Sequence, residues 1–295
     1  MEGGTKPDLI EQEIGIRLLW ANYRCRIAFT WILVLGESAA IALIPLFIGK
    51  AIDRLLDGGG IAAVTPLASV LILLTFFSVF RRAFDTRAYG TMRVFLGRCV
   101  VERNGDQPVS KLNARLDMAR EFGDFLEEHV PQLMTASVQL LVSFSILLSF
   151  DIALGASAGC LLVLIAIIYA CFHPAIFRAN RDLNEQREDQ VNVLEQRAIP
   201  RVIDHLAFLR RFEVRMSDID AALYGIVFLF MSAFILVNLV LAARIDAITA
   251  GTIFAVVTYS WEFVESGFAL PVTLQQWTRL EEIRTRLNKT AEADS

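Results

Sequence analysis

Six apolar segments, each close to the length that crosses a lipid bilayer, dominate the sequence. A hydrocarbon core about 30 Å thick requires roughly 20 apolar residues for each helical crossing. A hydrophobic content of 55% is also too high for an ordinary soluble domain. The sequence therefore predicts an all-α integral membrane protein with six transmembrane helices, at about 27–49, 62–80, 130–150, 152–172, 221–243 and 250–274.

Lysine and arginine lie almost entirely on one side of these crossings. Of the 28 basic residues, 25 precede the first crossing, follow the last, or lie between the second and third or the fourth and fifth. The positive-inside rule assigns that side to the cytoplasm. We therefore expect a multi-pass protein of the plasma membrane, in bacteria the inner membrane, with both termini in the cytoplasm.

The two long cytoplasmic connections, 81–129 and 173–220, carry apolar residues at helical spacing, whereas the turns on the other side are short. This pattern predicts that the crossings continue into the cytoplasm as long helical extensions. We expect one domain over residues 1–295, in which 275–295 form a cytoplasmic C-terminal helix and tail.

Composition and motifs exclude several classes of function. A net charge of −4 without a basic patch argues against a nucleic-acid partner. The four cysteines are scattered and form no CxxC pair, so neither a disulfide framework nor a zinc site is predicted. The three histidines lie at or outside the membrane boundary and suggest no nucleophile set. We expect no catalytic residues and no metal site.

Four local patterns resemble the transmembrane domain of ABC exporters, the type IV fold with six helices. IPLFIGKAIDRLLDG resembles the end of that family's first crossing, and LLSFDIALG resembles its tight turn between crossings three and four. RIDAITAGTIFAVVTY resembles the turn into crossing six, and LQQWTRLEEIRTRLN resembles the helix that leads out of it. The resemblance covers roughly residues 15 to 289. It implies a homodimer, because exporters of this type need twelve crossings to enclose a path.

Two departures from the family pattern concern the energy source. The chain stops at NKTAEADS, and no GxxxxGK[ST] phosphate loop occurs in it. We therefore expect no cofactor in this chain and no nucleotide-binding domain, with ATP used only through a separate ATPase partner. The first inner connection also has no aromatic residue between Phe95 and Phe122, where the family has an aromatic-rich coupling helix.

The stretch TYSWEFVESG places two carboxylates in the sixth apolar segment. Ionisable groups at the bilayer centre cost from about 2.5 kcal/mol upward and usually face a bundle interior or a water-filled cavity. Helical spacing puts Thr258, Glu262, Glu265 and Ser266 on one stripe. Glu37 reaches a similar depth in the first crossing.

In the family resembled, crossings one and six line the translocation cavity, so the resemblance implies that Glu37, Glu262 and Glu265 border a substrate or proton path. Two explanations stay open: the carboxylates bind a cationic substrate or carry protons, or they hydrate the cavity and pair with an arginine. Trp261 offers an indole face to a cation, although core packing also explains it. Asn238 in crossing five is expected to hydrogen-bond between helices.

Three functions fit these features. The first is an exporter-like permease subunit whose ATPase is a separate polypeptide. The second is a proton-coupled transporter of cationic solutes or peptides, since ATPase-less peptide-uptake transporters have membrane domains that look like this fold. The third is a non-transporting membrane scaffold whose long inner helices bind a partner.

Overall fold

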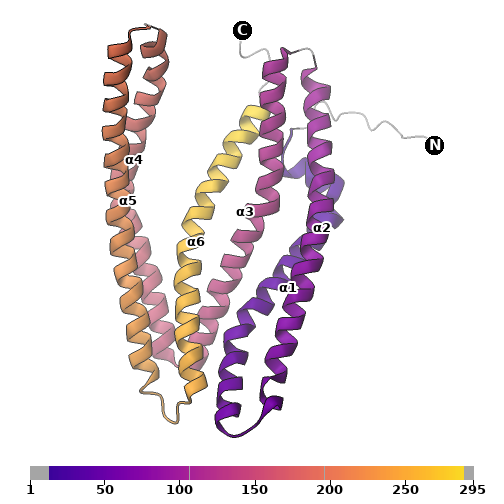
Figure 1. Ribbon diagram of the computed structural model, residues 1–295, viewed down its shortest axis with the longest axis vertical. Coiled ribbons are helices and arrows are strands. Elements are labelled where there is room, and N and C mark those ends of the chain that lie inside the picture. Colours follow the sequence, from indigo (N-terminus) through magenta and orange to yellow (C-terminus); the bar gives the residue numbers. More distant parts are fainter. Residues whose placement is uncertain (1–12, 106, 196, 289–295) are drawn as a thin grey trace, which may run out of the picture. The chain divides into compact units, whose positions relative to one another are not determined.

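The computed structural model describes residues 13–105, 107–195 and 197–288, with the side chains of 188, 191, 192, 270–279, 281, 282 and 286 outside that description. Long α-helices form nearly all of this part of the chain, and no strand occurs in it (Figure 1). The predicted all-helical fold is confirmed. The elements are α1 (Ile16–Leu56), the short 3₁₀ helix η1 (Ile61–Val64), α2 (Thr65–Asn104), α3 (Val109–Phe150), α4 (Ile152–Glu195), α5 (Ile199–Ala242) and α6 (Ala250–Asn288).

Five of these helices are long and apolar enough to span a membrane: α1, η1 with α2, α3, α4 up to Arg187, and α5. This finding supports a multi-pass membrane protein. The sixth predicted crossing, 250–274, falls in α6, which is not among the five. Because the side chains from 270 onward in that segment lie outside the described residues, the sixth crossing stays a prediction.

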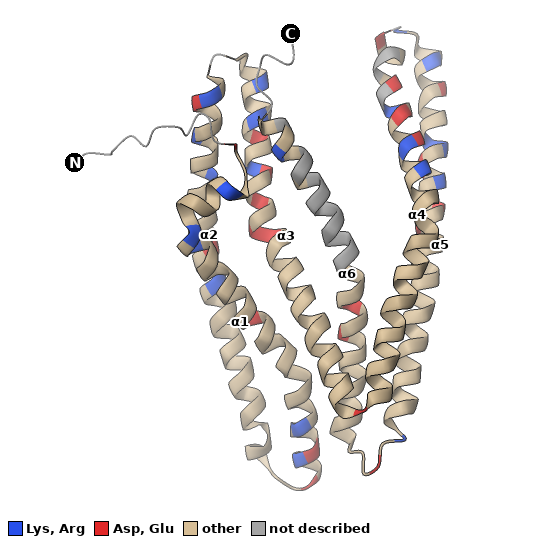
Figure 2. Cartoon of the chain, turned by 180° about the vertical axis from the view of Figure 1, so that it is seen from behind, with Lys and Arg blue, Asp and Glu red and all other residues tan. Residues whose placement is uncertain are grey.

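The helices are longer than a bilayer is thick. Helices of 39 to 44 residues measure roughly 60 Å at 1.5 Å per residue, about twice the hydrocarbon thickness. Figure 2 shows that charged residues gather toward one end of the α2–α3 pair and one end of the α4–α5 pair. These charged ends are where the predicted helical extensions would leave the membrane.

Contacts divide the chain into two compact units. The first, Met1–Ile146 with Ala247–Ser295, holds α1, α2, most of α3 and α6; we call it the four-helix unit. The second, Leu147–Asp246, is the α4–α5 hairpin. Within the hairpin, Ser157 Oγ donates a 2.5 Å hydrogen bond to Oδ1 of the fully buried Asn238. The predicted interhelical role of Asn238 is confirmed.

The core of the four-helix unit lies toward the charged end of α2 and α3. Here the first turns of α1 and the last turns of α6 pack on α2 and α3 through apolar side chains that include Leu19, Tyr89, Met92, Leu96, Phe122 and Leu287. Asn288 at the end of α6 joins the chain before α1: the Ile14 N–H donates to Asn288 Oδ1 at 2.7 Å, and Asn288 Nδ2 donates to the Ile14 carbonyl at 2.8 Å. These bonds hold the last turn of α6 against the start of α1.

At the opposite end, α1 and α6 touch through two glycines. A Cβ on Gly49 or on Gly251 would overlap the carbonyl oxygen of the other residue, so only glycine permits this approach. Asp53 stabilises the same contact between α1 and α6, because Thr249 Oγ1 and the Gly251 N–H each donate a hydrogen bond to its carboxylate at 2.7 Å. A carboxylate that accepts bonds at a helix N-terminus also interacts favourably with the helix dipole. The start of α6 is therefore held to the end of α1.

Candidate functional site: a carboxylate-lined cavity

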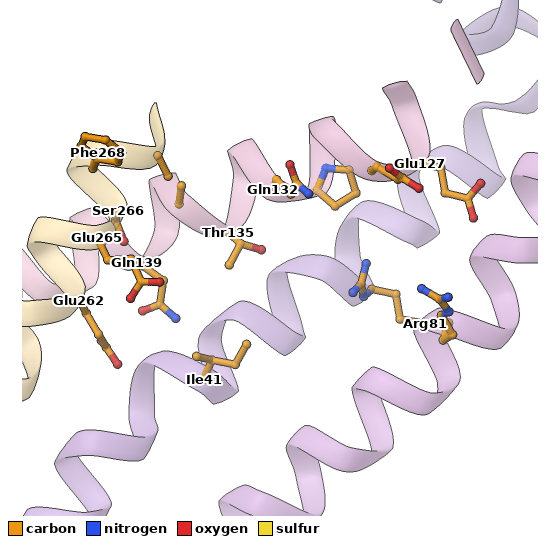
Figure 3. A pocket seen from close by; sticks show the side chains of 15 residues that line it. Ile41, Arg81, Glu127, Gln132, Thr135, Gln139, Glu262, Glu265, Ser266 and Phe268 are labelled. Atoms are coloured by element: carbon orange, nitrogen blue, oxygen red, sulfur yellow. The ribbon is translucent and has the colours of Figure 1, made fainter. Parts of the chain in front are cut away.

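An open cavity of about 910 Å³ lies in the four-helix unit, bordered by α1, α2, α3 and α6 (Figure 3). Its polar lining comes from two arginines, four glutamates and four uncharged residues: Arg81, Arg82, Glu127, Glu128, Glu262, Glu265, Gln132, Thr135, Gln139 and Ser266. The lining therefore carries more carboxylates than guanidinium groups. Such a wall favours a positively charged occupant.

The α6 end of the cavity carries Glu262. Figure 3 shows Glu262, Glu265 and Ser266 on α6 near Gln139 of α3. The Oε2 atom of Glu262 is buried and accepts no hydrogen bond from any described residue. Gln139 is 7% exposed, and its Oε1 atom likewise has no partner in the described part of the chain. Glu265, one turn further along α6, is exposed at the cavity rim.

Two other predicted site residues, Thr258 of the stripe and Trp261, are not among the residues that line the cavity in the described part of the chain. The Thr258 hydroxyl donates to the Phe254 carbonyl of its own helix at 2.9 Å. The Trp261 side chain is 56% exposed. The structure thus brings Glu262, Glu265 and Ser266 together at one wall and leaves Thr258 and Trp261 outside it.

Glu37 is not among the described residues that line the cavity, although the resemblance implied that it borders a substrate or proton path. Its carboxylate forms an ion pair with Arg81 of α2 and accepts a 2.5 Å hydrogen bond from Ser78 Oγ. Arg81 also lies 3.5 Å from the buried carboxylate of Asp85. Arg81 itself lines the cavity. The arginine pairing that the sequence left open therefore applies to Glu37.

Residues 16–251 match the family model described as ABC transporter transmembrane region. The chain belongs to this family. No curated protein matches the chain. Membership in the ABC transporter transmembrane region family agrees with the resemblance drawn from the sequence and supports a role in membrane transport. The matched residues end at Gly251, so the family match does not reach Glu262 or Glu265.

In this ABC transmembrane region, the remaining cavity wall comes from a polar stripe on α3 that was not predicted. Gln132, Thr135, Gln139 and Ser143 follow at intervals of three, four and four residues, which places them on one helical face. Thr135 hydrogen-bonds to Ser38 of α1 at 2.9 Å, and Gln132 and Gln139 line the cavity. The sequence does contain a signal for this stripe: its uncharged polar residues recur at the same helical spacing that identified Glu262.

The far end of the cavity is built from paired charges. Figure 3 shows Arg81 and Glu127 well away from Glu262. Glu127 forms an ion pair with Arg93 of α2, which also lies 2.6 Å from Asp124. Since Arg81 and Glu127 already have partners of opposite charge, their charges are largely balanced. Arg82 and Glu128 also line the cavity and carry opposite charges, so Glu262 and Glu265 account for the net negative charge of the lining.

Proposed function

We propose that this chain is the membrane subunit of an exporter-type ABC transporter, acts as a homodimer, and is driven by an ATPase on a separate polypeptide. The observation that carries the proposal is the polar cavity along α1, α2, α3 and α6 of an ABC transporter transmembrane region. A polar cavity between apolar helices provides a route for a solute that cannot cross lipid. The carboxylate excess of its wall supports a cationic solute.

Exposed apolar side chains on α5 support an assembly of several chains. Ile199, Ile203 and Leu206 lie at helical spacing on the part of α5 that precedes the apolar segment 221–243, and they are 73%, 60% and 49% exposed. Phe208 is 43% exposed and packs edge-on against Phe212. An apolar stripe on a charged helical extension is suited to a protein partner rather than to water. The second subunit or the ATPase would cover it.

Energy coupling separates the proposed function from the two alternatives. In inside-out membrane vesicles that hold the chain with its native partners, we expect uptake of a cationic dye to require hydrolysable ATP and to continue after the proton gradient is collapsed. The purified chain alone should hydrolyse no ATP, since it has no residue set to hold the β- and γ-phosphates. The control is the same vesicles with a non-hydrolysable ATP analogue. Uptake that stops with an uncoupler and ignores ATP would instead establish the proton-coupled transporter, and no uptake under either condition would favour the scaffold.

The proposed orientation places both termini and the charged helix ends in the cytoplasm. We expect a reporter that is active only in the cytoplasm to give signal when fused after Ser295 and to be silent when inserted in the 58–60 loop. This loop suits an insertion because it is exposed and links α1 to η1. The measurement is reporter activity at equal membrane abundance. The reverse pattern would refute the orientation given by the positive-inside rule.

A further inference from the structure

Three buried oxygen atoms without hydrogen-bond partners among the described residues meet at the α6 end of the cavity. They are Glu262 Oε2 on α6 and Gln139 Oε1 and Ser143 Oγ on α3. Gln139 is 7% exposed and Ser143 is fully buried. Ser143 Oγ lies close enough to interact with the Glu262 carboxyl, yet the two groups do not meet hydrogen-bond geometry. All three atoms belong to the four-helix unit.

Unsatisfied polar atoms at one buried point indicate a ligand. A buried donor or acceptor left without a partner costs about 1–3 kcal/mol, and native proteins keep few of them. Here three occur together beside an open cavity, and two are on one face of α3, one turn apart. A bound group that donates hydrogen bonds to all three would remove this cost.

The chemistry of the three atoms selects the kind of group. A carboxylate and an amide oxygen accept hydrogen bonds only, and the serine hydroxyl can accept as well. A primary ammonium has a positive charge and three N–H donors, so it matches one carboxylate and two neutral acceptors. A divalent metal fits less well, because Ca²⁺ takes about six to eight oxygen ligands and Mg²⁺ about six, so the three oxygens fill at most half of either coordination sphere.

The surroundings suit an amine with an apolar body. Ile41, Ala136 and Phe268 line the same cavity and provide hydrocarbon surface. The exposed carboxylate of Glu265 adds a second negative charge nearby. Arg81 lies at the far end of the cavity and is paired with Glu37, so its positive charge repels a bound cation only weakly.

We propose that Glu262, Gln139 and Ser143 form the binding site for the primary ammonium group of the transported solute. This inference rests on the proposed transport function and adds a substrate class to it. Glu262 supplies the negative charge, and the two α3 residues accept hydrogen bonds that orient the ammonium group. Selectivity follows, because a quaternary ammonium keeps the charge but has no N–H to donate.

The test is equilibrium binding of 2-phenylethylamine to the purified chain in lipid nanodiscs, compared with its N,N,N-trimethyl derivative. We expect the trimethyl compound to bind at least about tenfold more weakly, which is the usual effect of losing a charge-assisted hydrogen bond. Glu262→Gln and Gln139→Leu should each weaken binding of the amine by at least about tenfold. Glu102→Gln is the control: it removes one exposed carboxylate charge of α2 that does not line the cavity, and it should change affinity less than about twofold.

Equal binding of the two compounds would overturn the proposal, as would equal losses in Glu262→Gln and Glu102→Gln. Binding of K⁺ or Na⁺ without binding of the amine would also overturn it and assign the site to an alkali ion. Ser143→Ala, a small change, keeps the test valid if Gln139→Leu misfolds, and it too should weaken amine binding. Amine binding without ATP-driven transport would refute the transport function alone. Transport of another solute by a chain that does not bind the amine would refute this inference alone.

Discussion

Replacing Arg81 with methionine is expected to lower the free energy of unfolding by about 3–5 kcal/mol, the usual effect of removing one member of a buried ion pair. The side chains of Glu37 and Arg81 are only 13% and 27% exposed, and the pair joins α1 to α2. Methionine keeps much of the apolar stem but leaves the Glu37 and Asp85 carboxylates without their cation. The measurement is unfolding in mixed micelles titrated with SDS, followed by tryptophan fluorescence.

A matched exposed pair provides the control. Arg98 and Glu102 lie 2.6 Å apart on α2, with side chains 73% and 37% exposed, so Arg98→Met should change stability by less than about 1 kcal/mol. Adding Glu37→Gln to Arg81→Met removes one unpaired carboxylate charge and should recover part of the lost free energy of unfolding. If Arg81→Met and Arg98→Met cost the same, the Glu37–Arg81 pair does not stabilise the contact between α1 and α2.

Replacing Gly251 with alanine is expected to destabilise the protein by about 1–3 kcal/mol, the typical cost of overpacking a close contact. The added methyl group would overlap the Gly49 carbonyl oxygen and approach the Asp53 carboxylate, and backbone atoms cannot rotate away as a side chain can. The helices must separate, which also weakens the Asp53 hydrogen bonds to Thr249 and Gly251. The same SDS titration measures the loss.

Gly225→Ala is the control for this substitution. Gly225 lies in α5, and apart from the backbone of its own helix no atom of the described residues comes within 4 Å of the place that a Cβ would take. Alanine should therefore leave stability unchanged or raise it by up to about 1 kcal/mol through helix propensity. Gly49→Ala should behave like Gly251→Ala, because each glycine faces the other. A Gly251→Ala protein as stable as Gly225→Ala would show that α1 and α6 do not meet at these residues.

Periodicity and hydropathy predicted the fold well because they are local properties. A run of about 20 apolar residues commits its backbone to a helix wherever it lies in the bilayer, since lipid offers no hydrogen bonds to N–H and C=O groups. The breaks between helices also followed local signals, such as the NGDQP turn that separates α2 from α3. The sixth crossing is the exception, because the structure describes only part of its side chains.

The candidate site was predicted only in part. Helical spacing identified Glu262 and Glu265, and both line the cavity. Helical spacing did not identify Gln139 and Ser143 as site residues, because an uncharged polar residue in an apolar segment has many possible roles. For Glu37, helical spacing could not choose between a cavity wall and an ion pair, since Arg81 lies 44 positions away on another helix.

The sequence by itself determined the helices and their order, because helical periodicity and the length of an apolar run depend only on neighbours along the chain. Tertiary structure alone decided which faces meet. The contact of Gly49 with Gly251 brings α6 against α1, and an ion pair joins Glu37 to Arg81. The approach of α3 to α6 leaves Glu262, Gln139 and Ser143 without hydrogen-bond partners among the described residues. Each outcome depends on the rotation of one helix against another, and that rotation is set by side-chain contacts between residues far apart in the sequence.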